Sequence, residues 1–263
     1  MTFRPWVLAE VPYRHVQETP YQVAVLPMGA TEPHNLHLPY GTDTYQVEEL
    51  ADRACAAAYE QGARVVRLPV IPYGTETNLR EFPLAMNLQP STIGRMITDL
   101  AGSLNESGVH KLLILNGHGG NDFKPLLREM YGRTPVQLFL CDWFKGLSAD
   151  VQRTIFASPG DHAGEMETSL GLAFFSHLVQ VAPETGQLLA DDGSMAATQL
   201  DAVNRGWVSI TRPWHLLTTN TGAGNPHPAT AEKGMQLMEV MVERLASFLV
   251  ELAELPLGER FPY

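Results

Sequence analysis

Cysteine is scarce in this sequence. Only two of the 263 residues are cysteines, Cys55 and Cys141, and they lie far apart, which excludes a Cys-x-x-Cys motif and a disulfide-rich scaffold. No run reaches the roughly 18 apolar residues that a membrane-spanning helix needs. The first residues, Met1 to Trp6, lack the apolar core of a secretory signal. These absences predict a cytoplasmic protein with free thiols.

Positive charge is also in short supply. Lys and Arg total 18 against 29 Asp and Glu, which gives a formal net charge of −11, and the basic residues do not cluster. An acidic surface of this kind is repelled by phosphate backbones and by anionic lipid headgroups. Nucleic acids and membranes are therefore not expected as partners, and a small-molecule ligand is.

The patterning predicts an α/β fold. Apolar, β-branched runs indicate strands at 21–27, 64–69, 111–115 and 136–141, while helical periodicity indicates helices at 44–61, 91–105, 122–131, 164–175 and 229–252. This alternation predicts right-handed βαβ units and a mostly parallel sheet flanked by helices on both faces. We expect one domain over residues 1–263 in a three-layer α/β/α arrangement.

Residues 181–219 are the exception, because their periodicity is low. They are expected to form a peripheral surface loop, with one short hairpin near 207–210.

Acidic and imidazole side chains gather in three segments that follow strands or open a helix. The segments are 32–43, which contains Glu32, His34, His37 and Asp43; 116–121, which contains His118 between Asn116 and Asn121; and 161–169, which contains Asp161, His162, Glu165 and Glu167. Ligands of open α/β sheets bind at the carboxyl ends of the strands. We therefore expect these segments to meet at one site.

The mixture of carboxylates and imidazoles is typical of a metal site. Calcium prefers oxygen ligands alone and structural zinc prefers thiolates, so zinc, manganese or iron is indicated. Glu32, His34, Asp43 and His118 are the expected ligands, because buried carboxylates are costly without a cation. His37 is expected beside the site, where it would orient a ligand.

At these residues the chain resembles the creatininase (creatinine amidohydrolase) family. The matching segments are Glu32 to Asp43, Asn116 to Asn121, His162 to Thr168, and Gly224 to Gly234, all in the family's order. The resemblance implies a creatininase-like hydrolase with two divalent ions, and a homo-oligomer. It implies that Glu32 and His118 hold one ion, that His34 holds the other, and that Asp43 bridges both.

The chain departs from the creatinine-hydrolysing members at one ligand. Those members have a glutamate two residues after the Asn-Gly-His imidazole, where this chain has Gly120. Glu167 is our candidate for the missing carboxylate, although a general acid/base role is an equal alternative. The departure also disfavours creatinine itself as the substrate.

A second departure lies in residues 73–86, a loop that lines the pocket in the family. Here Glu76 and Arg80 indicate a polar or anionic ligand. Gly119, Trp143 and Asp161 complete the expected substrate-binding set, although core packing is an equal alternative for Trp143.

The predicted reaction is metal-dependent hydrolysis of a C–N bond in a small cyclic amide or formamide, through a hydroxide that bridges two metal ions. His162 would protonate the leaving nitrogen, and Glu167 would position the water if it is not a ligand. One alternative is a metal-dependent isomerase or lyase that acts on a sugar or polyhydroxy acid. Another is a non-catalytic, metal-stabilised module that senses a ligand.

Overall fold

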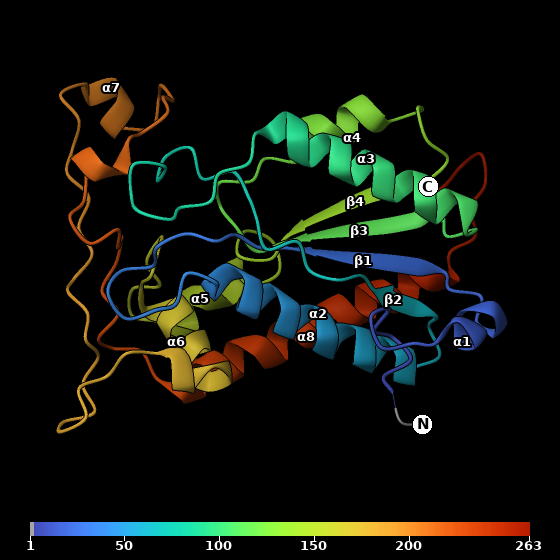
Figure 1. The fold of residues 1–263 in the computed structure, drawn as a ribbon, viewed down its shortest axis with the longest axis horizontal. Coiled ribbons are helices and arrows are strands. Elements are labelled where there is room, and N and C mark those ends of the chain that lie inside the picture. The colour runs from blue at the N-terminus through green and yellow to red at the C-terminus, as the bar shows by residue number, and fades with distance from the viewer. Residues whose placement is uncertain (1–2) are drawn as a thin grey trace.

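A parallel sheet of four strands forms the centre of the molecule (Figure 1). The computed structural model describes residues 3–263, so the start of the N-terminal segment, residues 1 and 2, lies outside it. The strands are β1 (Val23–Met28), β2 (Val65–Arg67), β3 (Lys111–Asn116) and β4 (Gln137–Asp142), in the order β2-β1-β3-β4, and each neighbouring pair is parallel. The predicted parallel sheet is confirmed.

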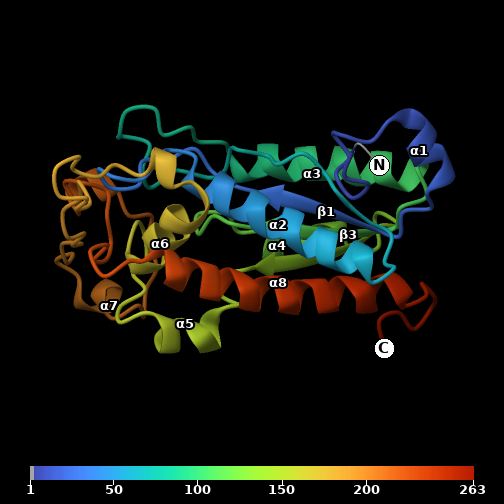
Figure 2. The same ribbon diagram turned by 90° about the horizontal axis from the view of Figure 1, so that it is seen from below.

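Helices cover both faces of this sheet. Five match the predicted helices: α2 (Thr42–Glu60), α3 (Pro90–Glu106), α4 (Lys124–Met130), α6 (Glu165–Phe174) and α8 (Ala231–Glu254). The helices α3 and α4 lie on one side of the sheet, and α2 and α8 lie on the other (Figure 1). On that second side, α2 and α8 run side by side along the molecule (Figure 2). This is the predicted three-layer arrangement.

The side-chain alternation of the strands explains the two covered faces. In β1, Val23 and Val25 pack into the core with α2 and α8, whereas Ala24 and Leu26 pack into the core with α3. All six residues of β1 are buried, because both of its faces meet helices. Burial of each large aliphatic side chain stabilises the fold by about 1.5–3 kcal/mol.

The short helices were not predicted. They are α1 (Tyr13–Glu18), α5 (Ala149–Ile155) and α7 (Asp201–Asn204), together with the 3-10 turns η1 (Ser176–Leu178) and η2 (Trp214–Leu216). No residue of α1, α5 or α7 is buried, and none of these helices is long enough for an apolar pattern to mark it in the sequence. The hairpin predicted near 207–210 is wrong, because those residues follow α7 as a turn and irregular chain.

The carboxyl ends of the two central strands are level with each other. Met28 of β1 pairs in register with Asn116 of β3, so the loops that follow them leave the sheet at the same edge. The segment around α7 arches over this end of the molecule, at the left of Figure 1. Within residues 3–263, no helix is both long and apolar enough to cross a membrane.

Candidate metal centre

The predicted ligands meet at this edge of the sheet. Glu32 and His34 lie in the loop after β1, His118 follows β3, and all three are buried. Asp43 is also buried, but it belongs to the first turn of α2 rather than to the loop, because the helix begins at Thr42. The positive end of the helix dipole favours a carboxylate at that position.

His118 directs one ring nitrogen at two carboxylates. Its Nε2 donates to the carbonyl oxygen of Thr75 at 3.2 Å. When the ring is neutral, the lone pair is therefore on Nδ1, which lies 3.0 Å from Glu32 Oε1 and 2.9 Å from Asp43 Oδ2. The side chain of Asn116 holds the turn, since it accepts from the backbone N–H of His118 and donates to its carbonyl. One imidazole and two carboxylates thus converge on one point.

His34 repeats this arrangement on the other side of Asp43. Its Nδ1 donates to the carbonyl oxygen of Glu32 at 3.1 Å, and its Nε2 lies 3.1 Å from Asp43 Oδ1. The two carboxylate oxygens of Asp43 therefore face two different imidazoles, His34 at Oδ1 and His118 at Oδ2. A carboxylate in this position can bridge two cations.

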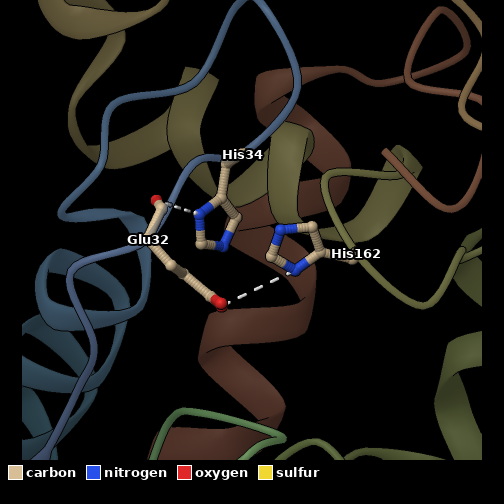
Figure 3. Close-up of side chains that lie close together, drawn as sticks. All are labelled: Glu32, His34 and His162. Carbon is tan, nitrogen blue, oxygen red and sulfur yellow. Dashed lines mark hydrogen bonds and ion pairs between the residues drawn. The ribbon is translucent and has the colours of Figure 1, made fainter. Parts of the chain in front are cut away.

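His162 stacks on the second imidazole. Its ring centroid is 4.1 Å from that of His34, with 32° between the ring planes. Its Nε2 donates to the carbonyl oxygen of Pro33 at 2.9 Å, so Nδ1 carries the lone pair of the neutral ring and lies 3.7 Å from Glu32 Oε1 (Figure 3).

Glu167 approaches the same group from α6. Its Oε2 accepts from the backbone N–H of Ala163, a residue whose φ is +51°. Ligand atoms of His34, Asp43 and Glu167 all lie within 4.8 Å of one another.

The electrostatics show how poorly this cluster tolerates unbalanced charge. Burial raises the pKa of Glu32 well above its usual range. Burial would also raise the pKa of Asp43, but the His34 and His118 imidazoles hold it below its usual range. Burial alone would lower the pKa of His34, yet the Asp43 carboxylate raises it to about 10. In the same way, the pKa of His118 is raised well above its usual value, against burial, by Glu32 and Asp43. The raised pKa values of His34 and His118 favour protonated rings, whose positive charge balances the neighbouring carboxylates. A bound metal cation could supply the same balance.

The pKa values of His162 and Glu167, which both line the cavity, shift in opposite directions. Burial and the neighbouring His34 lower the pKa of His162 to about 3, so this ring is neutral at pH 7. Burial raises the pKa of Glu167 to about 7. Glu167 can therefore exchange a proton near neutral pH, whereas His162 is present there as a neutral base.

The donor set fits divalent transition metals. Besides the group around Asp43, two more sets of ligand atoms lie within 4.8 Å of one another, namely Glu32 with His34 and His162, and Glu32 with Glu76 and His118. Three buried carboxylate oxygens in the cluster, Glu32 Oε2 and both oxygens of Glu76, accept no hydrogen bond. Such oxygens are costly unless a cation contacts them. Nitrogen and carboxylate ligands without thiolate suit zinc, manganese or iron.

Gly120 has no room for a side chain. A Cβ atom there would lie 2.3 Å from His118 Nε2 and 2.4 Å from the carbonyl oxygen of Thr75. The glutamate that the family resemblance implies at this position therefore cannot be accommodated without moving the 75–76 loop.

A cavity of about 480 Å³ opens onto the cluster. Nine of the predicted site residues line it: Glu32, Asp43, Glu76, His118, Gly119, Trp143, Asp161, His162 and Glu167. His34 is fully buried behind it. Arg80 does not line the cavity, because its side chain is 65 % exposed and lies beside Glu81. His37 hydrogen-bonds Thr168 Oγ1 at 2.8 Å and so orients that hydroxyl rather than a predicted ligand.

Part of the cavity wall was not predicted from the sequence. Asn78, Lys145, Gln152, Arg212 and Trp214 also line it. Arg212 and Trp214 come from the segment that was expected to be peripheral, and Asn78 anchors both: its Oδ1 accepts from the Arg212 N–H at 3.1 Å and its carbonyl from the Trp214 N–H at 2.9 Å. A tryptophan in an otherwise polar, aperiodic segment was the only signal of this role.

Comparison with known proteins places the chain in a family. Residues 9–249 match the model of the creatininase family, described as creatinine amidohydrolase. A solved structure from Bacteroides fragilis, described as a candidate creatinine amidohydrolase, is 35 % identical, with a TM-score of 0.86 over 96 % of this chain and 98 % of that one. The chain belongs to the creatininase family, as its motifs predicted, and has the metal-binding hydrolase fold of that family.

More distant relatives differ in their substrates. The mycofactocin precursor peptide peptidase of Mycobacterium ulcerans is 26 % identical over 235 residues, which are 85 % of this chain and 82 % of that protein. The creatinine amidohydrolase of Pseudomonas putida is 25 % identical over 248 residues, 87 % of this chain and 89 % of that protein. A creatininase solved in a manganese form shares the fold at 21 % identity, with a TM-score of 0.72 over 95 % of this chain and 100 % of that one.

Proposed function

We propose that this protein is a binuclear metal-dependent amidohydrolase that cleaves a C–N bond of a small amide. The position of Asp43 carries the proposal, because its two oxygens face two imidazoles from different segments. Glu32 and His118 would hold one divalent ion, His34 and Glu167 would hold the other, and Asp43 would contact both. Zinc, manganese and iron suit these ligands. The ions, when bound, would acidify a shared water and polarise the carbonyl of the substrate.

The protein's own residues would manage the protons. His162 is neutral at pH 7 and has a free lone pair on Nδ1, so it can accept a proton from the attacking water. The same nitrogen would then give that proton to the leaving nitrogen, which departs poorly as an anion. The hydrogen bond from Nε2 to Pro33 keeps the ring in the required tautomer.

Two basic residues in the cavity wall favour an anionic substrate. Arg212 and Lys145 bring two positive charges to a site whose other charged residues are mostly acidic. Guanidinium groups bind carboxylates through paired hydrogen bonds. We therefore propose a substrate with a small cyclic amide or formamide at the metal end and a carboxylate at the other end.

A panel of substrates tests this function. Purified protein reconstituted with zinc or manganese is incubated with N-formyl amino acids, cyclic imides and lactams with and without a carboxylate, creatinine, dipeptides, and polyhydroxy acids. We expect amine or carboxylate release from the carboxylate-bearing amides and none after chelation. Turnover of the polyhydroxy acids alone would contradict the proposal and indicate the isomerase or lyase alternative. Release from dipeptides alone would indicate a peptidase.

A further inference from the structure

Glu76 lies against the metal cluster, although no motif of the family marks it as a ligand. We infer that Glu76 is an additional metal-binding carboxylate, on the Glu32–His118 side of the centre. The inference rests on the proposed function, since it takes the centre to bind metal.

The environment of the Glu76 carboxylate carries the argument. The residue is 1 % exposed, and neither of its side-chain oxygens accepts a hydrogen bond from the protein. Oε2 lies 3.0 Å from His118 Nε2, but the N–H of that nitrogen is directed at the Thr75 carbonyl oxygen. A buried carboxylate with no donor needs a cation or a proton.

A cation has a place to bind there. Ligand atoms of Glu32, Glu76 and His118 lie within 4.8 Å of one another, and Glu32 Oε2 also accepts no hydrogen bond. The Thr75 carbonyl already holds the His118 ring in the tautomer that leaves Nδ1 free. Glu76 is therefore not needed to orient His118 and is available to contact the metal itself.

The local sequence brings Glu76 to this position. A Cβ at Gly74 would lie 2.9 Å from Glu76 Oε1 and 3.0 Å from His118 Cδ2, so the glycine lets these two side chains approach each other. The Oδ1 atom of Asn121 accepts from the Thr75 N–H at 3.0 Å and ties the two loops together. The carbonyl oxygen of Thr75 then occupies the space that a side chain at position 120 would need. The additional metal-binding carboxylate therefore comes from residue 76 instead of residue 120.

The charge balance agrees with this assignment. Glu32, Asp43, Glu76 and Glu167 carry four negative charges when ionised, which equal the charge of two divalent ions. Without Glu76 the buried centre would carry one excess positive charge until the shared water is ionised, because its two imidazoles are neutral as ligands.

The test compares Glu76→Gln with Glu81→Gln, a substitution at an exposed carboxylate of the same loop. Bound zinc per chain is measured by elemental analysis, and zinc affinity by competition with a chromogenic chelator. The visible spectrum of the cobalt-substituted protein reports the ligand field. We expect Glu76→Gln to weaken one of two ions by roughly 10- to 100-fold or more and to alter the cobalt spectrum, whereas Glu81→Gln matches wild type.

The outcomes separate this inference from the proposed function. Wild-type affinity and an unchanged cobalt spectrum in Glu76→Gln would overturn the inference, even if the wild type binds two ions and hydrolyses amides. Weaker binding with an unchanged spectrum would also overturn it, because Glu76 would then act through His118. A wild type that binds no metal would defeat the proposed function itself.

A second variant guards against misfolding. If Glu76→Gln does not fold, Glu76→Asp is tested in its place. Aspartate retains the negative charge, but its side chain is one methylene shorter, so the carboxylate lies farther from the metal. Reduced affinity with an altered cobalt spectrum in the folded aspartate variant supports the inference, and wild-type behaviour overturns it.

Discussion

The indole of Trp214 stands edge-on to the imidazole of His162, with ring centroids 5.1 Å apart and 89° between the planes. The same imidazole ring also stacks on that of His34. A residue from the irregular 181–219 segment thus fixes the ring that we propose moves the proton.

Truncation of this indole should damage turnover more than metal binding. Trp214→Ala opens the cavity wall and frees the His162 ring, so we expect activity to fall by roughly 100-fold, in line with the sensitivity of catalysis to misplacement. The loss of a buried tryptophan should also cost about 3–5 kcal/mol of stability. Trp207→Ala is the control, because that side chain is 73 % exposed and should matter little. Equal activity in both variants would contradict a positioning role for Trp214.

Removal of the proposed proton carrier should separate chemistry from metal binding. In His162→Gln we expect turnover to fall by roughly 100- to 10,000-fold while two ions remain bound. Steady-state kinetics with elemental analysis check both parts. Loss of an ion from this variant would instead identify His162 as a metal ligand. Its ligand atom lies within 4.8 Å of those of Glu32 and His34, which is close enough for that role.

Glu167 and Glu165 lie two residues apart on α6. Removal of the charge should affect metal affinity at Glu167 and protein stability at Glu165. Glu167→Gln should weaken the ion held with His34 and Asp43. The buried Glu165 instead pairs with Lys233 and accepts from the Ser158 N–H, so Glu165→Gln should lower thermal stability, by about 1–3 kcal/mol, and leave metal affinity unchanged. Chelator competition and thermal melts distinguish them. Unchanged affinity with lost turnover in Glu167→Gln would assign it acid/base chemistry.

Metal binding should release protons. The pKa of His34 is raised to about 10, and that of His118 is also raised, so both rings are protonated at pH 7 in the metal-free protein. A metal ion must displace those protons, and its apparent affinity should therefore increase as the pH rises from about 6 towards 9. Calorimetric titrations in buffers of different ionisation enthalpy measure the protons released. Buffer-independent heats would contradict this prediction.

Two arginines allow a matched test of substrate charge. Arg212 lines the cavity and Arg80 does not, although the sequence had suggested Arg80. Arg212→Gln should raise KM for a carboxylate-bearing amide by roughly tenfold, about 1.4 kcal/mol, and leave a neutral analogue unaffected. Arg80→Gln should change neither. A similar loss for both substrates would exclude selective recognition of the carboxylate.

The sequence alone was sufficient to predict the sheet and most of the residues that the structure brings together in the candidate metal centre. Runs such as 111–115 predict strands because a short, continuous apolar run is typical of a strand buried on both faces. Glu32, His34 and His118 could be predicted because each lies shortly after a strand, and parallel strands bring their carboxyl ends to one edge.

Only the tertiary structure decided which other side chains reach that edge. Glu76 reaches His118 because the loop at Gly74 packs against Asn121, and Trp214 reaches His162 because Asn78 holds its backbone. These contacts join segments that are far apart in the chain and have no periodicity of their own. Periodicity and motif spacing report local geometry, whereas such approaches depend on how whole loops pack, so no local pattern could have distinguished Arg212 from Arg80.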